Sequence, residues 1–503
     1  MKNVEQESQQ GVEYMPLPEL KIWKHRAKFP IISWWMGVWV STAELAGAVA
    51  REGWIGTLSA AAITMIPEYR EYRLGVLKEA KKAAGGKLSK EEARNLFKQA
   101  NIRCIKEEIR KAKEISQWNG AIFINIMVAT KYYDDYVKAA CEAGVDGIVS
   151  GAGLPSKLPR LTAEYPDVAI VPIVSSEKAA RVITGQWNKS YEVMSEIENN
   201  KVTTINGQKI ENREWILYQK DWIKILPTTD TPNTITVGDR EYIYAIDEET
   251  QSITLKKQYE GKKPDAVVVE SVKTWGWHLW AVKGKLSEVD NVDTTLEVAV
   301  PAVVELLKQE RIKQEEIDNG IRAKWWKVMR ENIKIPVIAA WWIVTREDID
   351  EKLALWAEWV QIGTVFATTK ESNAHQDFKD DIINAEPDKV GLYNSNACYP
   401  ARYLIKSLEG EDLEGLIAKK QECLRECLNH CALRDGIPGY AQICIEKKLV
   451  HSTRWSNGKW LKFIWWPFDA DGKNKIRDKL KIVSSITVKE LFELRTKKEP
   501  QAA

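Results

Sequence analysis

One histidine in this chain is placed where it could do chemistry. The chain has five histidines, and His278 lies in the stretch TWGWHLW at 274–280, shortly after an apolar run. Because an imidazole titrates near working pH, it can take a proton from a substrate or hold an anionic oxygen. A histidine in such a loop can also serve the structure alone, and the residues by themselves leave both interpretations open.

A second candidate is a phosphate site. Phosphate binding needs backbone N–H groups that a ligand can approach closely, and glycine permits that approach because it has no side chain. Gly363 and Thr364, within the apolar run 360–366, suit this role. After the preceding run, 335–340, the chain carries Trp341 and Trp342 instead. Bulky residues in a strained strand-to-loop turn cost on the order of 1–3 kcal/mol each, which contradicts a phosphate site there.

Four of the seven cysteines are crowded between residues 423 and 444. Cys423, Cys427 and Cys431 would share one face if this stretch were helical, because they are four residues apart. With Cys444 they could form a four-thiolate metal site. The spacing is not that of a zinc ribbon or a ferredoxin, so we predict buried apolar thiols and no metal site.

Composition excludes several classes of protein. Among 503 residues, 73 Lys and Arg stand against 71 Asp and Glu, so the formal net charge of +2 gives no reason to expect a nucleic-acid partner. The N-terminal residues lack a basic-then-apolar signal pattern, and the longest apolar run, 29–40, is too short to span a bilayer. Seven cysteines in so long a chain do not suggest a secreted disulfide framework. We therefore expect a cytoplasmic protein without membrane or nucleic-acid contacts.

The candidate residues follow short apolar runs that alternate with helical segments. The eight predicted strands are 29–36, 55–60, 121–127, 147–150, 168–175, 266–270, 335–340 and 360–366. The predicted helices include 41–52, 90–114, 132–143, 296–308 and 346–356. Continuously apolar strands that alternate with helices are typical of a (β/α)8 TIM barrel, which places its active site at the C-terminal strand ends. A doubly wound open sheet is the alternative.

Two regions depart from this alternation. Residues 190–262 have a period of two and turn signals at Asn206-Gly207 and Gly238-Asp239, which predicts an inserted β-rich subdomain. It could decorate the barrel rim or serve as a lid or partner surface. We also expect a C-terminal α-helical extension with the cysteine cluster, and a solvated helix face for the basic run 106–113. The predicted boundaries are 1–28 for an N-terminal arm and lead-in, 29–189 for barrel strands one to five, 190–262 for the insert, 263–387 for strands six to eight, and 388–503 for the extension.

Four motifs in order make the sequence similar to a known family. They are SWWMGVWVS at 33–41, WGWHLW at 275–280, AAWWI at 339–343 and QIGT at 361–364. They resemble QGGMGVGVS, AGGHLG, AAGGI and QMGT, the motifs of the nitronate monooxygenase family of flavin-binding TIM barrels. The resemblance covers about residues 20–190 and 262–495.

This resemblance implies a bound FMN and roles for individual residues. Met36 and Gly37 would contact the isoalloxazine through their backbone, and the Asn125 side chain would hydrogen bond to it, although Asn125 could also be an ordinary strand-end cap. His278 would lie by the flavin ring and the nitro group. The residues implied in holding the ribityl phosphate are Gly276, Gln361, Gly363 and Thr364, together with the positions of Trp341 and Trp342.

The resemblance also implies a reaction. An alkyl nitronate would be oxidised with O₂ to a carbonyl compound and nitrite. Two alternatives remain: an NAD(P)H-dependent flavin reductase acting on an enoyl thioester or a quinone, and a flavin-free binding protein if the tryptophans fill the phosphate site. The sequence does not indicate an oligomeric state.

Most departures from the family motifs put tryptophan where the family has glycine. The chain has 22 Trp and only 28 Gly, about 5.6% against an average near 7%. Trp187, by contrast, falls where the family itself carries Trp. We hypothesise that the gene comes from a lineage that reads the UGA codon as glycine. The substituted positions are Trp23, Trp34, Trp35, Trp39, Trp54, Trp118, Trp277, Trp280, Trp341, Trp342, Trp356, Trp359 and Trp465.

Overall fold

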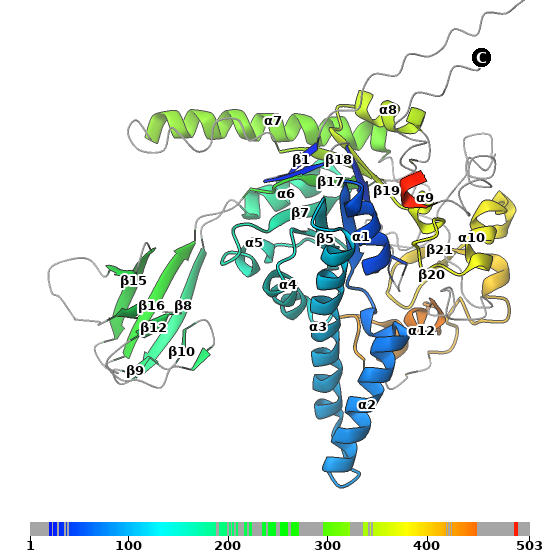
Figure 1. Cartoon of the computed structure of the whole chain (residues 1–503), viewed down its shortest axis with the longest axis horizontal. Coiled ribbons are helices and arrows are strands. Elements are labelled where there is room, and N and C mark those ends of the chain that lie inside the picture. The colour runs from blue at the N-terminus through cyan, green and yellow to red at the C-terminus, as the bar shows by residue number, and fades with distance from the viewer. Residues whose placement is uncertain are drawn as a thin grey trace, which may run out of the picture. The chain divides into compact units, whose positions relative to one another are not determined.

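A computed structural model describes most of the chain (Figure 1). The described residues are 20–187 without 23, 28–29, 35–36 and 38–39, the strands between 191 and 259, and 263–270, 295–321, 335–340, 343, 346–449 without 419, 421–422 and 424, and 487–490. The chain divides into two compact units, one of residues 1–155, 165–181 and 264–503, the other of residues 156–164 and 182–263.

Eight parallel strands close into a barrel, which confirms the predicted fold class. In order around the barrel they are β17 (Val267–Glu270), β18 (Val337–Ala340), β19 (Trp359–Ile362), β3 (Ile31–Ser33), β4 (Ile55–Ser59), β5 (Ala121–Asn125), β6 (Gly147–Ser150) and β7 (Ala169–Val174). Each lies within a predicted apolar run or overlaps it. Every residue of these strands is buried, as expected for a parallel sheet covered by helices on its outer face.

Helices connect these strands, and the predicted ones are present. They are α1 (Ala43–Arg51), α3 (Lys90–Ile115), α4 (Tyr133–Glu142), α6 (Glu177–Trp187), α7 (Leu296–Ile321), α8 (Arg346–Ala354) and the short α5 (Leu158–Leu161) and α9 (Thr364–Ala367). A capping box begins α3, because the Ser89 side chain accepts from the amide of Glu92 while the Glu92 side chain accepts from that of Ser89. An additional helix, α2 (Pro67–Ala83), follows the 3₁₀ turn at Ile63–Met65 and packs along α3 (Figure 1).

A hairpin that was not predicted covers the N-terminal end of the barrel. β1 (Leu20–Ile22) pairs antiparallel with β2 (His25–Ala27), and Ile22 is fully buried. The His25 ring meets Phe123 of β5 edge to face, with centroids 6.0 Å apart. Lys24 forms an ion pair of 2.8 Å with Asp167, just before β7, which places the hairpin at that end.

The inserted segment is β-rich, as predicted. Its main sheet is antiparallel in the order β14 (Thr234–Val237), β15 (Arg240–Asp247), β16 (Ser252–Tyr259), β8 (Tyr191–Glu198) and β9 (Lys201–Val202). Two hairpins accompany it: β10 (Thr204–Ile205) with β11 (Gln208–Lys209), and β12 (Ile216–Tyr218) with β13 (Asp221–Ile223). The predicted turns lie between paired strands, since Ile205 pairs with Gln208 and Val237 with Arg240. Its first and last strands are also partners, with Tyr191 opposite Tyr259.

The extension contains helices, as expected, and also a hairpin that was not predicted. Its described elements are α10 (Gln376–Ile383), the hairpin β20 (Val390–Asn394) and β21 (Pro400–Leu404), α11 (Ala432–Asp435), α12 (Ile445–Leu449) and 3₁₀ turns at Pro387–Lys389 and Ile405–Ser407. The stretch from Cys423 to Cys431 is not helical, so these cysteines do not share a helix face. Within the described part of the chain, no group of His, Cys, Asp or Glu side chains could hold a metal ion.

Candidate functional site at the C-terminal strand ends

Buried polar side chains gather where the barrel strands end. Parallel strands in a barrel place their C-terminal ends on one rim, where barrel enzymes carry their active sites. Six of the eight strands have a buried polar residue in one of their last two positions, in a barrel that is otherwise largely apolar. These residues are Ser33, Ser59, Asn125, Ser150, Glu270 and Gln361.

Asn125 and Gln361 each have a side-chain oxygen without a hydrogen-bond partner. Asn125 Nδ2 donates to the carbonyl oxygen of Val149 at 3.1 Å, while Asn125 Oδ1 has no hydrogen bond. Gln361 Nε2 lies 3.5 Å from the carbonyl oxygen of Ser33, and Gln361 Oε1 is likewise without a partner. Both residues are only 1% exposed. Because a buried unsatisfied polar group costs about 1–3 kcal/mol, the pair fits a ligand that brings its own N–H or O–H donors.

The loop from β3 to α1 is attached to this rim at both ends. The amide of Trp34 donates to the carbonyl oxygen of Ile362 at 2.7 Å, which continues the pairing of β3 with β19. At the other end, Ser41 Oγ donates to the carbonyl oxygen of Trp34 at 3.1 Å. The amide of Ser59 donates to the carbonyl oxygen of Ser41. Gly37, between these attachments, is buried.

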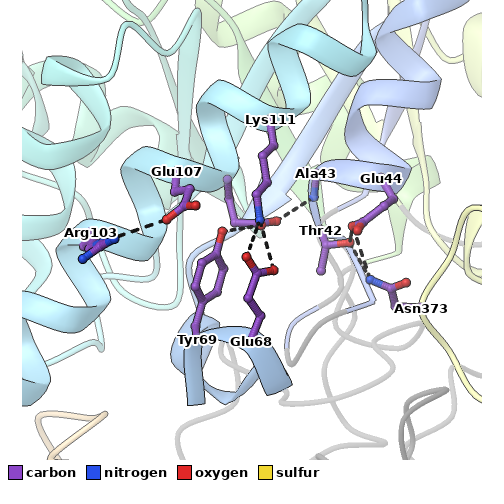
Figure 2. Close-up of polar contacts among 10 residues, drawn as sticks. Thr42, Ala43, Glu44, Glu68, Tyr69, Arg103, Glu107, Lys111 and Asn373 are labelled. Atoms are coloured by element: carbon purple, nitrogen blue, oxygen red, sulfur yellow. Dashed lines mark hydrogen bonds and ion pairs between the residues drawn. The ribbon is translucent and has the colours of Figure 1, made fainter. Parts of the chain in front are cut away.

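The base of α1 is held by a buried carboxylate from α3. The amide of Ala43 donates to Glu108 Oε2 at 2.8 Å, and the Tyr69 hydroxyl donates to Glu108 Oε1 at 2.9 Å (Figure 2). Lys111 Nζ lies 3.9 Å from the same oxygen, Glu108 Oε1. Burial raises the pKa of Glu108, against the opposing effect of these hydrogen bonds. Glu108 therefore caps the N-terminus of α1 and holds the point where the β3–α1 loop ends.

Sequence reasoning missed this residue because Glu108 lies in the basic run 106–113, which was expected to be solvated. One signal was present: Cys104, Ile105, Glu108, Ile109 and Ala112 follow the helical period of a buried face, and all of them are buried.

A second buried contact joins two loops of the rim. Asn373, which follows α9, donates through Nδ2 to Thr42 Oγ1 at 2.7 Å (Figure 2). Thr42 Oγ1 donates in turn to Glu44 Oε2 at 2.5 Å. The loop after β19 and the start of α1 are thus fixed to each other on the side of the barrel where Gly363 lies.

Trp34 lies directly against Gly363. A Cβ placed on Gly363 would be 3.1 Å from the Cβ of Trp34, and the Trp34 side chain is only 7% exposed. The indole therefore covers the glycine to which the family resemblance assigns phosphate binding. The unsatisfied oxygens of Asn125 and Gln361 fit a bound cofactor, whereas the side chain of Trp34 competes with it for space.

The structure brings Gly37, Asn125, Gln361 and Gly363 to the same end of the barrel, with Thr364 as the first residue of α9. The other predicted site residues lie outside the described part of the chain. They are Met36, Gly276, His278, Trp341 and Trp342.

The architecture is that of a parallel eight-stranded barrel with buried polar side chains at its C-terminal strand ends. A family model described as nitronate monooxygenase matches residues 19–198 and 230–458. The chain belongs to the nitronate monooxygenase family and is a flavin-dependent oxidoreductase. None of the helices in the described part of the chain is long and apolar enough to cross a membrane.

Comparison with solved structures gives distant likenesses. FabK from Thermotoga maritima is 19% identical over 75% of this chain and 72% of that chain, with a TM-score of 0.40. Nitroalkane oxidase from Streptomyces ansochromogenes is 14% identical over 93% and 94%, with a TM-score of 0.49. A search among curated proteins found no match. The family assignment rests on the family match alone.

Proposed function

We propose that this protein is an FMN-dependent nitronate monooxygenase, which oxidises alkyl nitronates with O₂ to a carbonyl compound and nitrite. The observation that carries the proposal is the pair of unsatisfied oxygens, Asn125 Oδ1 and Gln361 Oε1, at strand ends of a barrel that belongs to this family. Buried acceptors of this kind suit the N–H and O–H groups of a flavin mononucleotide.

The protein's own groups would bind and orient the cofactor. Met36, Gly37 and Asn125 would hold the isoalloxazine, Gln361 would accept from a hydroxyl of the ribityl chain through Oε1, and Gly276, Gly363 and Thr364 would hold the phosphate with positions 341 and 342. Bound FMN would supply the redox chemistry. Glu108 and Asn373 would be positioning residues that do not contact the cofactor. They hold the start of α1 and with it one end of the β3–α1 loop.

His278 would contact the substrate. A nitronate is an anion, and an imidazole at the mouth of the barrel can hold its oxygen or move a proton at its carbon. The rim loops would keep water from the reacting groups.

The test is an assay on purified protein. Absorbance establishes whether a flavin is bound, and nitrite release with O₂ consumption is then followed with an alkyl nitronate. We expect H278A to retain flavin and lose most nitrite formation, whereas H430A, at an exposed histidine, should match the parent. Rapid flavin reduction by NADH or NADPH would instead indicate a reductase. Protein that remains colourless with FMN after the tryptophan at position 34 is replaced by glycine would indicate a flavin-free binding protein.

A further inference from the structure

Four connections that lead from a barrel helix to the next strand contain a residue with positive φ. Gly53 follows α1 with a φ of 85°, and Gly144 follows α4 with a φ of 73°. After α8 the corresponding residue is Trp356, with a φ of 70°, and after α3 it is Gln117, with a φ of 52°, followed by Trp118, with a φ of 60°. Two of these turns therefore use glycine in the left-handed conformation, one uses tryptophan, and one uses glutamine followed by tryptophan.

All four turns have the same hydrogen bond. The amide of Gly53 donates to the carbonyl oxygen of Ala50 at 2.8 Å, and that of Gly144 to Cys141 at 2.9 Å. The amide of Trp356 donates to Leu353 at 3.1 Å, again three residues back, and after α3 the amide of Gln117 donates to Glu114 at 3.1 Å in the same way. Each of these residues stands two positions after the end of its helix. Trp356 thus occupies the C-terminal helix cap that glycine normally fills.

In the turn after α3 the cap position is Gln117, and Trp118 follows it. The amide of Trp118 donates to the carbonyl oxygen of Lys113 at 3.4 Å, five residues back, as in a Schellman motif. Gln117 before it also has positive φ, at 52°. Two successive left-handed residues without glycine make this turn the more strained of the two.

The two tryptophan side chains make few stabilising contacts at these positions. Trp118 is 72% exposed and Trp356 is 68% exposed. Each has one cation above its ring: Lys113 lies 5.5 Å from the Trp118 centroid and Lys308 lies 5.1 Å from that of Trp356. A cation–π contact at an exposed site is at most comparable to the cost of a left-handed backbone for a residue with a Cβ. Exposed indoles therefore do not explain these residues.

Three other tryptophans of the chain are buried and have an ordinary backbone conformation with negative φ. Trp187 ends α6 and is 1% exposed, and neither Trp54 nor Trp359, both buried, has positive φ. The conflict between residue type and backbone is therefore confined, among the described tryptophans, to the two helix caps.

We propose that positions 118 and 356 are glycine in the functional protein, because its source reads as glycine the UGA codon that the printed sequence renders as tryptophan. This inference does not depend on the proposed function, since both caps precede barrel strands and lie at the end opposite the flavin site. The internal comparison with Gly53 and Gly144 carries it for position 356, and the left-handed backbone of an exposed residue carries it for position 118.

Peptide mass spectrometry of the protein from its native source tests this directly. Tryptic peptide 114–131 contains position 118, and peptide 353–370 contains position 356, which fragment ions separate from position 359. We expect glycine at 118 and 356, and tryptophan at 187 in peptide 182–189 as the internal control. Tryptophan at 118 or 356 would overturn the proposal.

Stability measurements on recombinant protein test the backbone argument. We expect W118G and W356G each to raise the midpoint of thermal unfolding, and W118A and W356A to fall short of the glycine variants, because alanine keeps the Cβ. W187G is the control and should lower the midpoint, since it empties a buried site. Equal effects of alanine and glycine would show that the exposed indole, and not the backbone, is responsible, and would overturn the argument.

Discussion

The amide of Ala43 in α1 and the carboxylate of Glu108 in α3, two residues 65 positions apart in the chain, form a buried hydrogen bond of 2.8 Å. It caps α1 from outside the helix, in a position where the Thr42 side chain makes no capping bond. Since the β3–α1 loop ends at this point, the contact couples the packing of α2 and α3 to the rim of the barrel.

Removing this carboxylate should destabilise the fold. E108A leaves the amide of Ala43 and the Tyr69 hydroxyl without their acceptor, which should lower the free energy of unfolding by about 1–3 kcal/mol. Urea denaturation measures the difference. The matched control is E107A, at the neighbouring half-exposed residue, which should change stability far less. A similar loss of unfolding free energy in both variants would mean that Glu108 stabilises the fold through its charge on α3 and not through its hydrogen bonds to Ala43 and Tyr69.

Glu108 should also contribute to the pH dependence of stability. Burial raises the pKa of Glu108 in the folded state above its ordinary value of 4.5, so the folded protein binds this proton more readily than the unfolded chain. Its contribution is therefore most favourable below pH 4.5 and declines as pH rises through the folded pKa. The difference in the free energy of unfolding between the parent and E108Q should therefore shift against the parent as pH rises from 4.5 through the folded pKa of Glu108. A difference that is constant with pH would contradict this.

Asn125 should matter for flavin binding more than for folding. N125A removes the unsatisfied Oδ1, and the carbonyl oxygen of Val149 keeps the amide of Ile126 as a donor. We expect FMN affinity to fall about tenfold, from one lost hydrogen bond of roughly 1 kcal/mol or more, with little change in the midpoint of the flavin-free protein. Fluorescence titration and thermal melts give the two values. A large loss of stability with unchanged affinity would assign Asn125 a structural role.

Replacing Trp34 should open the site beside Gly363. W34G removes the indole that covers this glycine, and it should raise FMN affinity while lowering the stability of the flavin-free protein, because a buried side chain is lost. FMN should then raise the midpoint of W34G more than that of the parent. W118G is the control, since position 118 lies at the opposite end of the barrel and should leave FMN affinity unchanged. An equal response of both variants would rule out a local effect.

His25 should make the fold sensitive to mild acid. Burial lowers the pKa of His25 below its ordinary value of 6.5, so the unfolded chain binds this proton more readily. The contribution is fully present above pH 6.5 and is lost as pH falls toward the folded pKa. In urea denaturation between pH 7.5 and 5, H25Q should show a shallower decline than the parent, whereas H430Q, at an exposed residue, should follow the parent.

The barrel was predictable because its strands are read from continuous apolar runs, each bounded by turns or helix starts. The predicted run 121–127 placed Asn125 near the end of its strand for the same reason, whereas Gln361 lay near the start of the predicted run 360–366 and is close to a strand end because β19 already ends at Ile362. Glu108 was missed because its burial depends on α2 and α1 packing against α3, which local charge does not reveal. The hairpins β1–β2 and β20–β21 were missed because strands of three to five residues without alternation give little periodic signal.

The pairing of Tyr191 with Tyr259 has an evolutionary consequence. Because the first and last strands of the insert are neighbours in one sheet, the two ends of the segment lie side by side, with paired backbones about 5 Å apart. A segment whose two ends already lie together can be gained or lost as one unit.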